Sequence, residues 1–322
     1  MKTYLVTGVA GFVGSRLAAM ILERGDAVVG IDSLEDGEGA ILREHRLQDL
    51  LPWPRFRFHR MNILDFQALD DLMARERFQA VFHLAAKAGV RQSLVDPWTY
   101  LRVNADGTLN VLEAMRRNGG TRMILASTSS LYAGLPLPFS EDAAVNTPIS
   151  PYAASKKAAE AMAYTYHHQY GISVAILRYF TVFGPSGRPD MAPFRFIESV
   201  RQGLPVVVHG DGGQTRDFTF VDDICRGTLQ AEALGGYQIV NLGGGKEPVS
   251  IRQFLEWIEE LVGRRAIVRH EPSHEADMRE TMADIRKARE LMDWSPRVDV
   301  RQGLVATVGW HLRRLPAWRI AS

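Results

Sequence analysis

Cysteine is almost absent from the chain, because Cys225 is the only one among its 322 residues. An intrachain disulfide is therefore excluded, and such cysteine usage is typical of proteins from a reducing compartment. Cys225 falls within an apolar helical pattern, so we expect it to fill the core rather than to act as a nucleophile.

The chain also lacks an excess of either charge and any long apolar run. Its 38 basic and 37 acidic side chains give a net charge of +1, with no Lys/Arg-rich segment. Because nucleic-acid binders usually carry a basic face, we expect no nucleic-acid partner. A membrane-spanning helix needs about 18 consecutive apolar residues, and no segment has them. The N-terminus has no signal-peptide pattern, so we expect a cytoplasmic protein without a membrane segment.

Short β-branched apolar runs alternate with helical patterns over the first half of the sequence. Strands are predicted at 4–7, 27–32, 56–62, 80–84, 122–127 and 173–178, and helices at 13–24, 66–76, 104–117 and 152–170. This alternation predicts an α/β fold of the Rossmann type, with a doubly wound parallel sheet. Such sheets bind ligands at the carboxyl ends of their strands.

Beyond residue 178, prolines and glycines break the pattern and predict a smaller C-terminal substrate lobe. A helix at 221–234 and a strand at 237–241 indicate that the chain returns to the main domain. We therefore assign 1–178 and 217–242 to the main domain, and 179–216 and 243–322 to the smaller lobe.

A glycine-rich turn joins the first predicted strand to the first helix. In TGVAGFVG, Gly8 permits a tight turn, Gly11 lets the backbone approach a pyrophosphate, and Gly14 allows close packing of helix on sheet. The free N–H groups of the helix N-terminus then face the phosphates. Asp32 ends the second strand, where a carboxylate accepts hydrogen bonds from ribose hydroxyls and repels a 2′-phosphate. The turn therefore predicts a dinucleotide site that prefers NAD to NADP.

A hydroxyl and a Tyr-x-x-x-Lys pair predict the catalytic groups. Tyr152 and Lys156 stand four residues apart in a predicted helix, so both lie on one face, and Thr128 ends a strand at the ligand-binding rim. We predict that Tyr152 is the acid–base group, that Lys156 tunes it, and that Thr128 orients the substrate. A free tyrosine has a pKa of about 10, so this role needs a pKa lowered by about three units, or roughly 4 kcal/mol. Lys156 and an oxidised nicotinamide ring would supply that stabilisation.

In combination, these residues resemble the extended short-chain dehydrogenases, and within them the nucleotide-sugar epimerases and dehydratases. The resemblance covers nearly the whole chain and includes HLAA at 83–86, STSSLY at 127–132, RYF at 178–180, GDG at 210–212, RDF at 216–218 and VDD at 221–223. It implies a bound NAD and a UDP- or dTDP-linked sugar in the smaller lobe. The implied NAD contacts are Gly8, Gly11, Phe12, Val13, Asp32, Asn62, Ile63, Leu84, Ala85, Ala86, Lys87, Asn104, Ser127, Tyr152, Lys156 and Tyr179.

The run that follows the catalytic strand separates the reaction types within this family. The dehydratases resemble Thr-Asp-Glu at this point and the decarboxylases carry Ser-Glu, whereas this chain has Thr128-Ser129-Ser130 and no acid. A site without that acid suits oxidation followed by re-reduction. The resemblance therefore favours an epimerase over a dehydratase.

The segment 179–192, YFTVFGPSGRPDMA, looks like the UDP-glucuronate 4-epimerases. In those enzymes the arginine of Arg-Pro-Asp faces the sugar carboxylate, which implies that Arg188 forks onto a carboxylate with two hydrogen bonds. Holding that charge would oppose the loss of CO2 from a 4-keto sugar. The resemblance implies interconversion of UDP-glucuronate and UDP-galacturonate by oxidation at C4, rotation of the 4-keto sugar and re-reduction.

The remaining substrate contacts are also implied by the resemblance. Arg216 and Arg279 match positions that neutralise the diphosphate, Asp277 lies beside them, and Val207–His209 and Phe194–Phe196 would flank the uracil. His209 departs from the usual aromatic, and Arg91 stands near the active site without a defined role. The predicted set is Arg91, Thr128, Ser129, Ser130, Thr181, Arg188, Ala192, Phe194, Val207, His209, Arg216, Asp277 and Arg279.

Other interpretations remain open at this point. A UDP-glucose/UDP-galactose-type 4-epimerase would not need Arg188, and a UDP-glucuronate decarboxylase or an inactive NAD-bound binding protein are further alternatives. The spacing of His270 and His274 suits a metal pair, but no cysteine or third histidine accompanies them, so we expect no metal. The helices at 104–117 and 152–170 resemble the pair that forms the family's dimer interface, which implies a homodimer.

Overall fold

A seven-stranded parallel sheet forms the centre of the computed structural model, which describes residues 1–35, 37, 39–273 and 277–314. The strands lie in the order β11-β6-β5-β4-β1-β2-β3. Their bounds are β1 (Thr3–Thr7), β2 (Ala27–Asp32), β3 (Phe56–Arg60), β4 (Ala80–His83), β5 (Arg122–Thr128), β6 (Ser173–Tyr179) and β11 (Tyr237–Leu242). The predicted Rossmann-type fold is confirmed. The strand order reverses between β1 and β4, the point at which such sheets bind their ligands.

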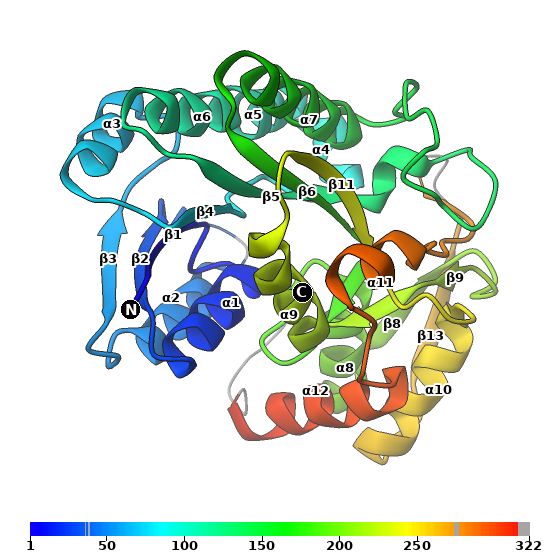
Figure 1. Cartoon of the computed structure of the whole chain (residues 1–322). Helices are drawn as coiled ribbons and strands as arrows, with labels where there is room; N and C mark the ends of the chain where they lie inside the picture. The colour runs from blue at the N-terminus through cyan, green and yellow to red at the C-terminus, as the bar shows by residue number, and fades with distance from the viewer. Residues whose placement is uncertain (36, 38, 274–276, 315–322) are drawn as a thin grey trace.

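Helices cover both faces of this sheet (Figure 1). The face that carries the glycine-rich turn is covered by α1 (Phe12–Glu23), α2 (Ala40–Leu50) and α9 (Val221–Gln230). The other face is covered by α3 (Phe66–Arg75), α5 (Pro97–Leu101), α6 (Gly107–Arg117) and α7 (Pro151–Tyr170), with the short α4 (Val90–Val95) beside α7. Each layer buries its apolar stripe against the sheet, which is the main force that holds the domain together.

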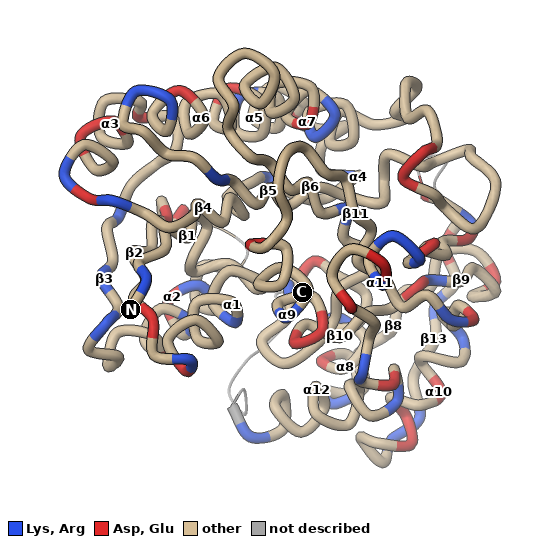
Figure 2. Tube along the Cα trace, in the orientation of Figure 1, with Lys and Arg blue, Asp and Glu red and all other residues tan. Residues whose placement is uncertain are grey.

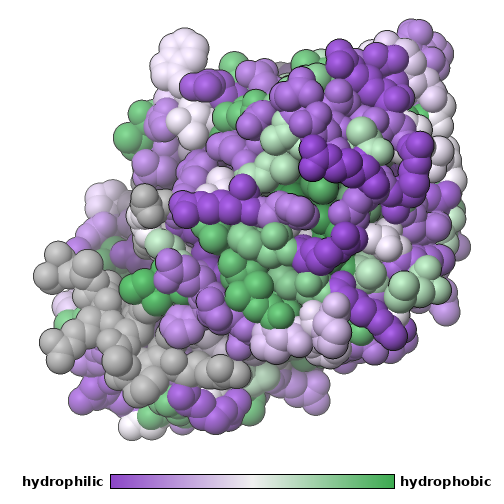
Figure 3. Space-filling model, turned by 90° about the vertical axis from the view of Figure 1, so that its left-hand side faces the viewer, coloured by the Kyte–Doolittle hydropathy of each residue, from purple (hydrophilic) through white to green (hydrophobic). Residues whose placement is uncertain are grey.

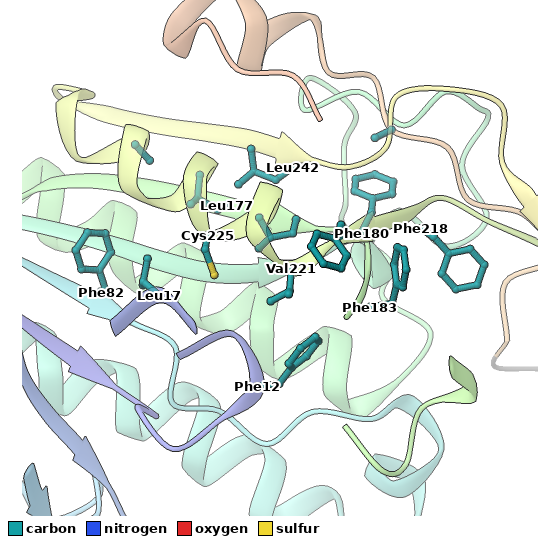
Figure 4. Close-up of a cluster of buried hydrophobic side chains, with 14 of the residues drawn as sticks. Phe12, Leu17, Phe82, Leu177, Phe180, Phe183, Phe218, Val221, Cys225 and Leu242 are labelled. Atoms are coloured by element: carbon teal, nitrogen blue, oxygen red, sulfur yellow. The ribbon is translucent and has the colours of Figure 1, made fainter. Parts of the chain in front are cut away.

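The core runs without a break from the sheet into the smaller lobe. Figure 4 shows Leu17 and Phe82 at one end of the cluster and the rings of Phe180, Phe183 and Phe218 gathered at the other. Cys225 lies between them on α9 with no exposed surface, so the expectation that it fills the core is confirmed. The two lobes therefore share one hydrophobic core.

The smaller lobe contains three two-stranded sheets and a group of helices. The sheets pair β7 (Thr181–Phe183) with β10 (Phe218–Phe220), β8 (Pro205–His209) with β13 (Ile267–Glu271), and β9 (Thr215–Arg216) with β12 (Val249–Ser250). The helices α8 (Ala192–Gln202), α10 (Ile251–Val262) and α12 (Val300–Arg314) pack together below them in Figure 1, and α11 (Arg286–Met292) lies against β11.

Several elements differ from the sequence-based prediction. The segment 218–220, which we assigned to the main domain, pairs as β10 with β7 in the smaller lobe, whereas β11 joins the main sheet beside β6. The predicted helix at 104–117 begins as a π-helix, Arg102–Asp106, and continues as α6. Helix α2 was not predicted, because its buried side combines Leu42, Leu47 and Leu50 with the charged Arg46, which weakens the apolar periodicity.

Most of the longer helices carry residues of both signs of charge, as Figure 2 shows, whereas most strands carry few charged residues. On the side of the molecule that faces the viewer in Figure 3, hydrophilic residues cover most of the surface around a smaller hydrophobic area. Among the described residues, no helix is long and apolar enough to cross a membrane.

Candidate active site

The glycine-rich turn lies between β1 and α1 and leaves no room for a side chain at its three glycine positions. A Cβ on Gly8 would lie 2.8 Å from Cα of Ala85, and a Cβ on Gly11 or Gly14 would lie 2.9 Å or 2.1 Å from the carbonyl oxygen of Gly8. Gly8 also has a φ of 70°, which favours glycine. Gly11 is the N-cap of α1 and supplies no side-chain cap, so the first N–H groups of the helix can serve a phosphate. The turn therefore fits the diphosphate of a dinucleotide.

A buried chain of hydrogen bonds holds β4 against this turn. The Thr7 hydroxyl accepts from the N–H groups of Leu84 (3.1 Å) and Ala85 (3.0 Å) and lies 2.7 Å from Nδ1 of His83. With both lone pairs used, the hydroxyl donates to Nδ1, so Nε2 carries the ring proton and donates to Thr108 at 3.0 Å. Burial lowers the pKa of His83 to about 3, which keeps the ring neutral. His83 is thus a fixed support for the backbone of Leu84 and Ala85.

Asp32 lies at the carboxyl end of β2, next to the glycine-rich turn. Its carboxylate accepts from the N–H of Ala10 at 3.0 Å and from the N–H of Leu34 at 2.9 Å. Burial raises the pKa of Asp32, and these two backbone hydrogen bonds act against that rise. Each carboxylate oxygen keeps a further lone pair that can accept from a ribose hydroxyl.

The other residues predicted to contact NAD lie around the same rim, but not all of them present a side chain. Both groups of the Asn104 amide are engaged, since Oδ1 accepts from the Lys87 N–H (2.8 Å) and Nδ2 donates to the Lys87 carbonyl (2.9 Å) and to Ser155 (2.9 Å). The side chain of Ile63 is buried in the core, and the hydroxyl of Tyr179 is bonded to Thr228 on α9 at 2.7 Å. The side chains of Asn104 and Tyr179 therefore have their polar groups occupied by other protein groups, and that of Ile63 fills the core.

The predicted catalytic residues come together where β5 meets α7. Thr128, at the end of β5, makes a hydrogen bond with the phenol of Tyr152 from the first turn of α7, and Lys156 follows one turn later. Both Thr128 and Lys156 are buried, with 7 % and 4 % of their surfaces exposed. The Thr128 hydroxyl also lies 3.1 Å from that of Ser130, which places a second hydroxyl in the group.

The electrostatics of this group differ from the expectation in one respect. Burial raises the pKa of Tyr152, and it outweighs the hydrogen bond with Thr128 and the positive charge of Arg188, both of which lower it. The protein groups by themselves therefore do not give the expected lowering, which also depended on an oxidised nicotinamide ring. Burial also lowers the pKa of Lys156 to about 8, although the carboxylate of Glu160 acts against that shift. Lys156 thus remains mostly charged at neutral pH.

A buried ion pair behind the catalytic group was missed in the sequence. Arg178 at the end of β6 donates to both carboxylate oxygens of Glu160, at 3.0 and 2.8 Å, and Ser127 donates to Glu160 at 2.6 Å. Arg178 also donates to the hydroxyl of Tyr132 at 2.8 Å. Glu160 follows Lys156 by four residues on α7, so helical spacing was the signal that could have found it.

Arg188 reaches the catalytic group from a loop of the smaller lobe. Its guanidinium donates to the Ala88 carbonyl at 3.1 Å and forms an ion pair with Asp190. Its positive charge acts on the phenol of Tyr152, and so does the negative charge of Asp190. The structure thus brings Arg188 near Tyr152, the predicted acid–base residue, across 36 residues of sequence.

Arg91, His209 and Asp277 form a second group of polar side chains. Arg91 forms an ion pair with Asp277, and its Nη1 lies 2.6 Å from Nε2 of His209. The charges of Asp277 and Arg91 both act on Arg216, whose pKa burial lowers. Arg216 in turn donates to the carbonyl of Arg279 at 3.3 Å. Three of the residues predicted to bind the nucleotide diphosphate or base, Asp277, His209 and Arg216, therefore lie near Arg91, whose role the sequence left undefined.

The predicted contact between Phe194 and the uracil is not supported for its side chain. Phe194 is 3 % exposed and packs against Leu42 of α2 and His311 of α12, with 4.6 Å between the rings of Phe194 and His311. In contrast, Val207 and His209 alternate with buried residues of β8 and share its half-buried face. Ser129 and Ser130 continue from Thr128 in a 3-10 turn, Thr181 is half-buried at the start of β7, and Ala192 begins α8.

Among the described residues, no group of three or more His, Cys, Asp or Glu side chains is placed to hold a metal ion. Nδ1 of His270 donates to the Gly210 carbonyl at 2.8 Å, and His274 lies outside the described residues.

Comparison with known families decides the relationship of this chain. The model of the NAD dependent epimerase/dehydratase family matches residues 4–243, which include the glycine-rich turn, Thr128, Tyr152 and Lys156. The chain belongs to this family. It is 49 % identical over 310 residues to a UDP-glucuronate 4-epimerase of Thermodesulfobacterium geofontis, and the match covers 96 % of each chain.

Solved structures extend the likeness to the whole architecture. The UDP-glucuronic acid 4-epimerase from Bacillus cereus, in complex with UDP-glucuronic acid and NAD, is 38 % identical and superposes with a TM-score of 0.90, covering 96 % of this chain and 98 % of that one. The UDP-glucose 4-epimerase of Thermotoga maritima, solved with UDP-glucose, is 29 % identical with a TM-score of 0.89 and the same coverage. Members of this family with charged and with neutral sugar substrates therefore share this fold.

Proposed function

We propose that this chain is an NAD-dependent UDP-glucuronate 4-epimerase, which interconverts UDP-glucuronate and UDP-galacturonate. The observation that carries the proposal is the position of Arg188, whose charge acts directly on the acid–base residue Tyr152. A guanidinium there can fork onto a sugar carboxylate while the C4 hydroxyl meets the phenol. The 49 % identity to a UDP-glucuronate 4-epimerase supports the same substrate.

The residues around the rim fit NAD as the cofactor. We assign the diphosphate to the glycine-rich turn, whose close contacts exclude any Cβ, and the adenosine ribose to Asp32. NAD bound at these residues would supply the hydride acceptor for oxidation at C4 and the hydride donor for re-reduction. We further propose that 1–178 with most of 217–242 hold the cofactor, and that 179–216 and 243–322 hold the UDP-sugar.

The protein groups have distinct parts in the proposed reaction. Tyr152 removes the proton of the C4 hydroxyl and gives it back after the sugar has turned, while Thr128 fixes the hydroxyl by hydrogen bonding. We assign to the positive charge of Lys156 the role of favouring the phenolate, which burial by itself disfavours. Arg188 and the hydroxyls of Ser129 and Ser130 hold the carboxylate, and this opposes decarboxylation because loss of CO2 needs charge to leave that group.

Product analysis tests the proposal. Incubation of the protein with UDP-glucuronate and catalytic NAD is expected to give UDP-galacturonate as the product seen by NMR. A UDP-pentose as the main product would contradict it and indicate a decarboxylase. An Arg188→Ala variant is expected to lose activity on UDP-glucuronate; full activity in that variant would favour a neutral-sugar epimerase, and no turnover of any UDP-sugar by the unaltered protein would indicate a binding protein.

We also infer a homodimer in the cytoplasm. Helices α6 and α7 lie side by side in the outer layer, and the neighbouring α4 and α5 carry Val95 and Trp98, each 76 % exposed. Two large apolar side chains at such exposure suit a contact with a second copy. Trp98→Asp is expected to halve the mass measured by light scattering, whereas Trp53→Asp, on the opposite face of the sheet, should leave it unchanged; an unaltered protein that is already monomeric contradicts the inference. Cell fractionation tests the location.

A further inference from the structure

Arg46 joins two loops of the active site that lie far apart in the sequence. It projects from α2 and is 6 % exposed. Nη1 donates to the carbonyl of Ala10 at 3.3 Å, and Nη2 donates to the carbonyls of Ser186 and Gly187 at 2.6 and 2.8 Å. Nε lies 3.1 Å from both the carbonyl and the hydroxyl oxygen of Ser186. One guanidinium therefore ties together two backbone segments that begin in different lobes.

The first of these segments is the glycine-rich turn. Ala10 stands between Gly8 and Gly11, and its N–H donates to Asp32 at 3.0 Å. Ala10 is thus held at both backbone groups, its carbonyl by Arg46 and its N–H by Asp32, the predicted partner of the ribose. A displacement of Ala10 would disturb both Asp32 and the turn.

The second segment carries Arg188. Ser186 and Gly187 immediately precede Arg188, and Ser186 has a φ of 57°, a left-handed conformation that non-glycine residues adopt only when their surroundings impose it. Arg46 supplies such surroundings, since it binds Ser186 at both the carbonyl and the hydroxyl. The direction in which Arg188 leaves the loop depends on this backbone conformation.

The placement of a cation at this point is energetically demanding, which argues that it does more than fill space. Burial lowers the pKa of Arg46 to about 9, and the charges of Arg43 and Arg188 act in the same direction. Among the described residues, Arg46 forms no ion pair; carbonyl oxygens accept its hydrogen bonds, and the charge of Asp32 acts against the lowering of its pKa. A fork of five N–H donors suits several carbonyls at once, whereas a lysine ammonium is a point charge.

We propose that Arg46 is a positioning residue that holds the Arg188 loop against the glycine-rich turn and so sets the preference for a carboxylate-bearing sugar. The proposal rests on the proposed function, because the preference is expressed through Arg188. Loss of the guanidinium frees Ser186 to leave its left-handed conformation, and Arg188 then no longer meets the carboxylate in a fixed direction. The residues that we assign to the diphosphate and uracil of the UDP-sugar lie on other elements, so we expect those contacts to be kept.

The test compares the affinities for a charged and a neutral sugar nucleotide. Dissociation constants for UDP-glucuronate and UDP-glucose are measured by calorimetry on the NAD-loaded protein in a Tyr152→Phe background, which stops turnover. Arg46→Met is expected to weaken UDP-glucuronate about tenfold, roughly 1.4 kcal/mol, with about twofold or less change for UDP-glucose. The affinity of Arg46→Lys for UDP-glucuronate should fall between those of Arg46→Met and the protein with Arg46 intact, because lysine keeps the charge but loses the fork.

Two controls on the same helix separate positioning from general damage. Gln48→Ala alters an exposed side chain and should change neither affinity. Leu50→Ala removes a buried side chain, 2 % exposed, without touching Ser186, and should lower stability while leaving the ratio of the two affinities unchanged. A ratio that falls equally in Leu50→Ala and Arg46→Met would overturn the proposal, as would an unchanged ratio in Arg46→Met.

Turnover gives a second measurement that does not depend on the amount of folded enzyme. In a protein that keeps Tyr152, the single substitution Arg46→Met is expected to raise the fraction of UDP-pentose among the products from UDP-glucuronate, because the carboxylate is held less firmly. An unchanged fraction of UDP-pentose contradicts the proposed role of Arg46 but not the proposed function. If the natural protein does not epimerise UDP-glucuronate at all, the proposed function fails instead, so the two failures are distinguished.

Discussion

The buried pair of Glu160 and Arg178 allows a demanding test of how the site is held together. Both side chains are 1 % exposed, and Glu160 accepts two hydrogen bonds from Arg178 and one from Ser127. Glu160→Gln removes the negative charge while nearly keeping the volume. The variant leaves the guanidinium of Arg178 in the core without a counter-charge.

The size of the effect follows from the burial of both partners. Removal of one member of a buried ion pair costs about 3–5 kcal/mol, since the remaining charge is left uncompensated. Gln retains an oxygen that can accept one of the two hydrogen bonds, and Arg178 keeps its bond to Tyr132 and its position 4.9 Å from the centre of that ring. We therefore expect the lower end of that range, about 3 kcal/mol of unfolding free energy.

Denaturant unfolding of the protein measures this loss, with a surface carboxylate as the control. Glu113 also pairs with two arginines, Arg116 and Arg117, but on the exposed side of α6, so Glu113→Gln should cost about 1 kcal/mol or less. The double variant Glu160→Gln with Arg178→Met should recover part of the loss, because it removes the unpaired charge. A loss in Glu160→Gln no larger than that in Glu113→Gln would refute the reasoning.

Three further predictions concern acid stability, cofactor choice and catalysis. Burial lowers the pKa of His83 to about 3, so its ring stays neutral in the native protein, whereas in the unfolded chain it gains a proton below about pH 6.5. The free energy of unfolding therefore falls as the pH falls, by about 2 kcal/mol at pH 5. His83→Gln should remove that part of the pH dependence of unfolding, and equal losses in both proteins would count against it. Asp32→Ala should raise the ratio of NADP to NAD affinity about tenfold in binding titrations, and an unchanged ratio would show that Asp32 does not select the cofactor. Tyr152→Phe should lower kcat about 10²–10⁴-fold with NAD binding intact, and retained activity would exclude Tyr152 as the acid–base group.

Much of the fold and of the site could be predicted because the decisive residues are close together in the sequence. Helical spacing puts Tyr152 and Lys156 on one face, and the glycine-rich turn is formed by eight consecutive residues. Strand ends are equally local features, which is why Asp32 and Thr128 were placed on the correct rim. Local geometry repeats in every protein, so such patterns can be read without knowledge of the packing.

Where the prediction failed, the cause was packing between distant segments. Helix α2 went unnoticed because Arg46 occupies its buried side, and that position is favourable because the distant carbonyls of Ala10, Ser186 and Gly187 accept its hydrogen bonds. Phe194 was expected at the uracil, but α2 and α12 enclose its ring. Neither outcome is written in the local sequence.

The sequence by itself was therefore enough to predict the chemistry that its motifs indicate: a dinucleotide turn, a tyrosine and a lysine proposed for acid–base chemistry, and an arginine proposed to bind a carboxylate. The tertiary structure alone decided how strongly each group is perturbed. Burial raises the pKa of Tyr152, the opposite of the lowering expected with Lys156 and oxidised nicotinamide beside it. Tertiary contacts pair Arg91 with Asp277 and surround Arg46 with carbonyls. The reason is physical, because desolvation and hydrogen bonding depend on which distant atoms surround a group and not on its neighbours in the chain.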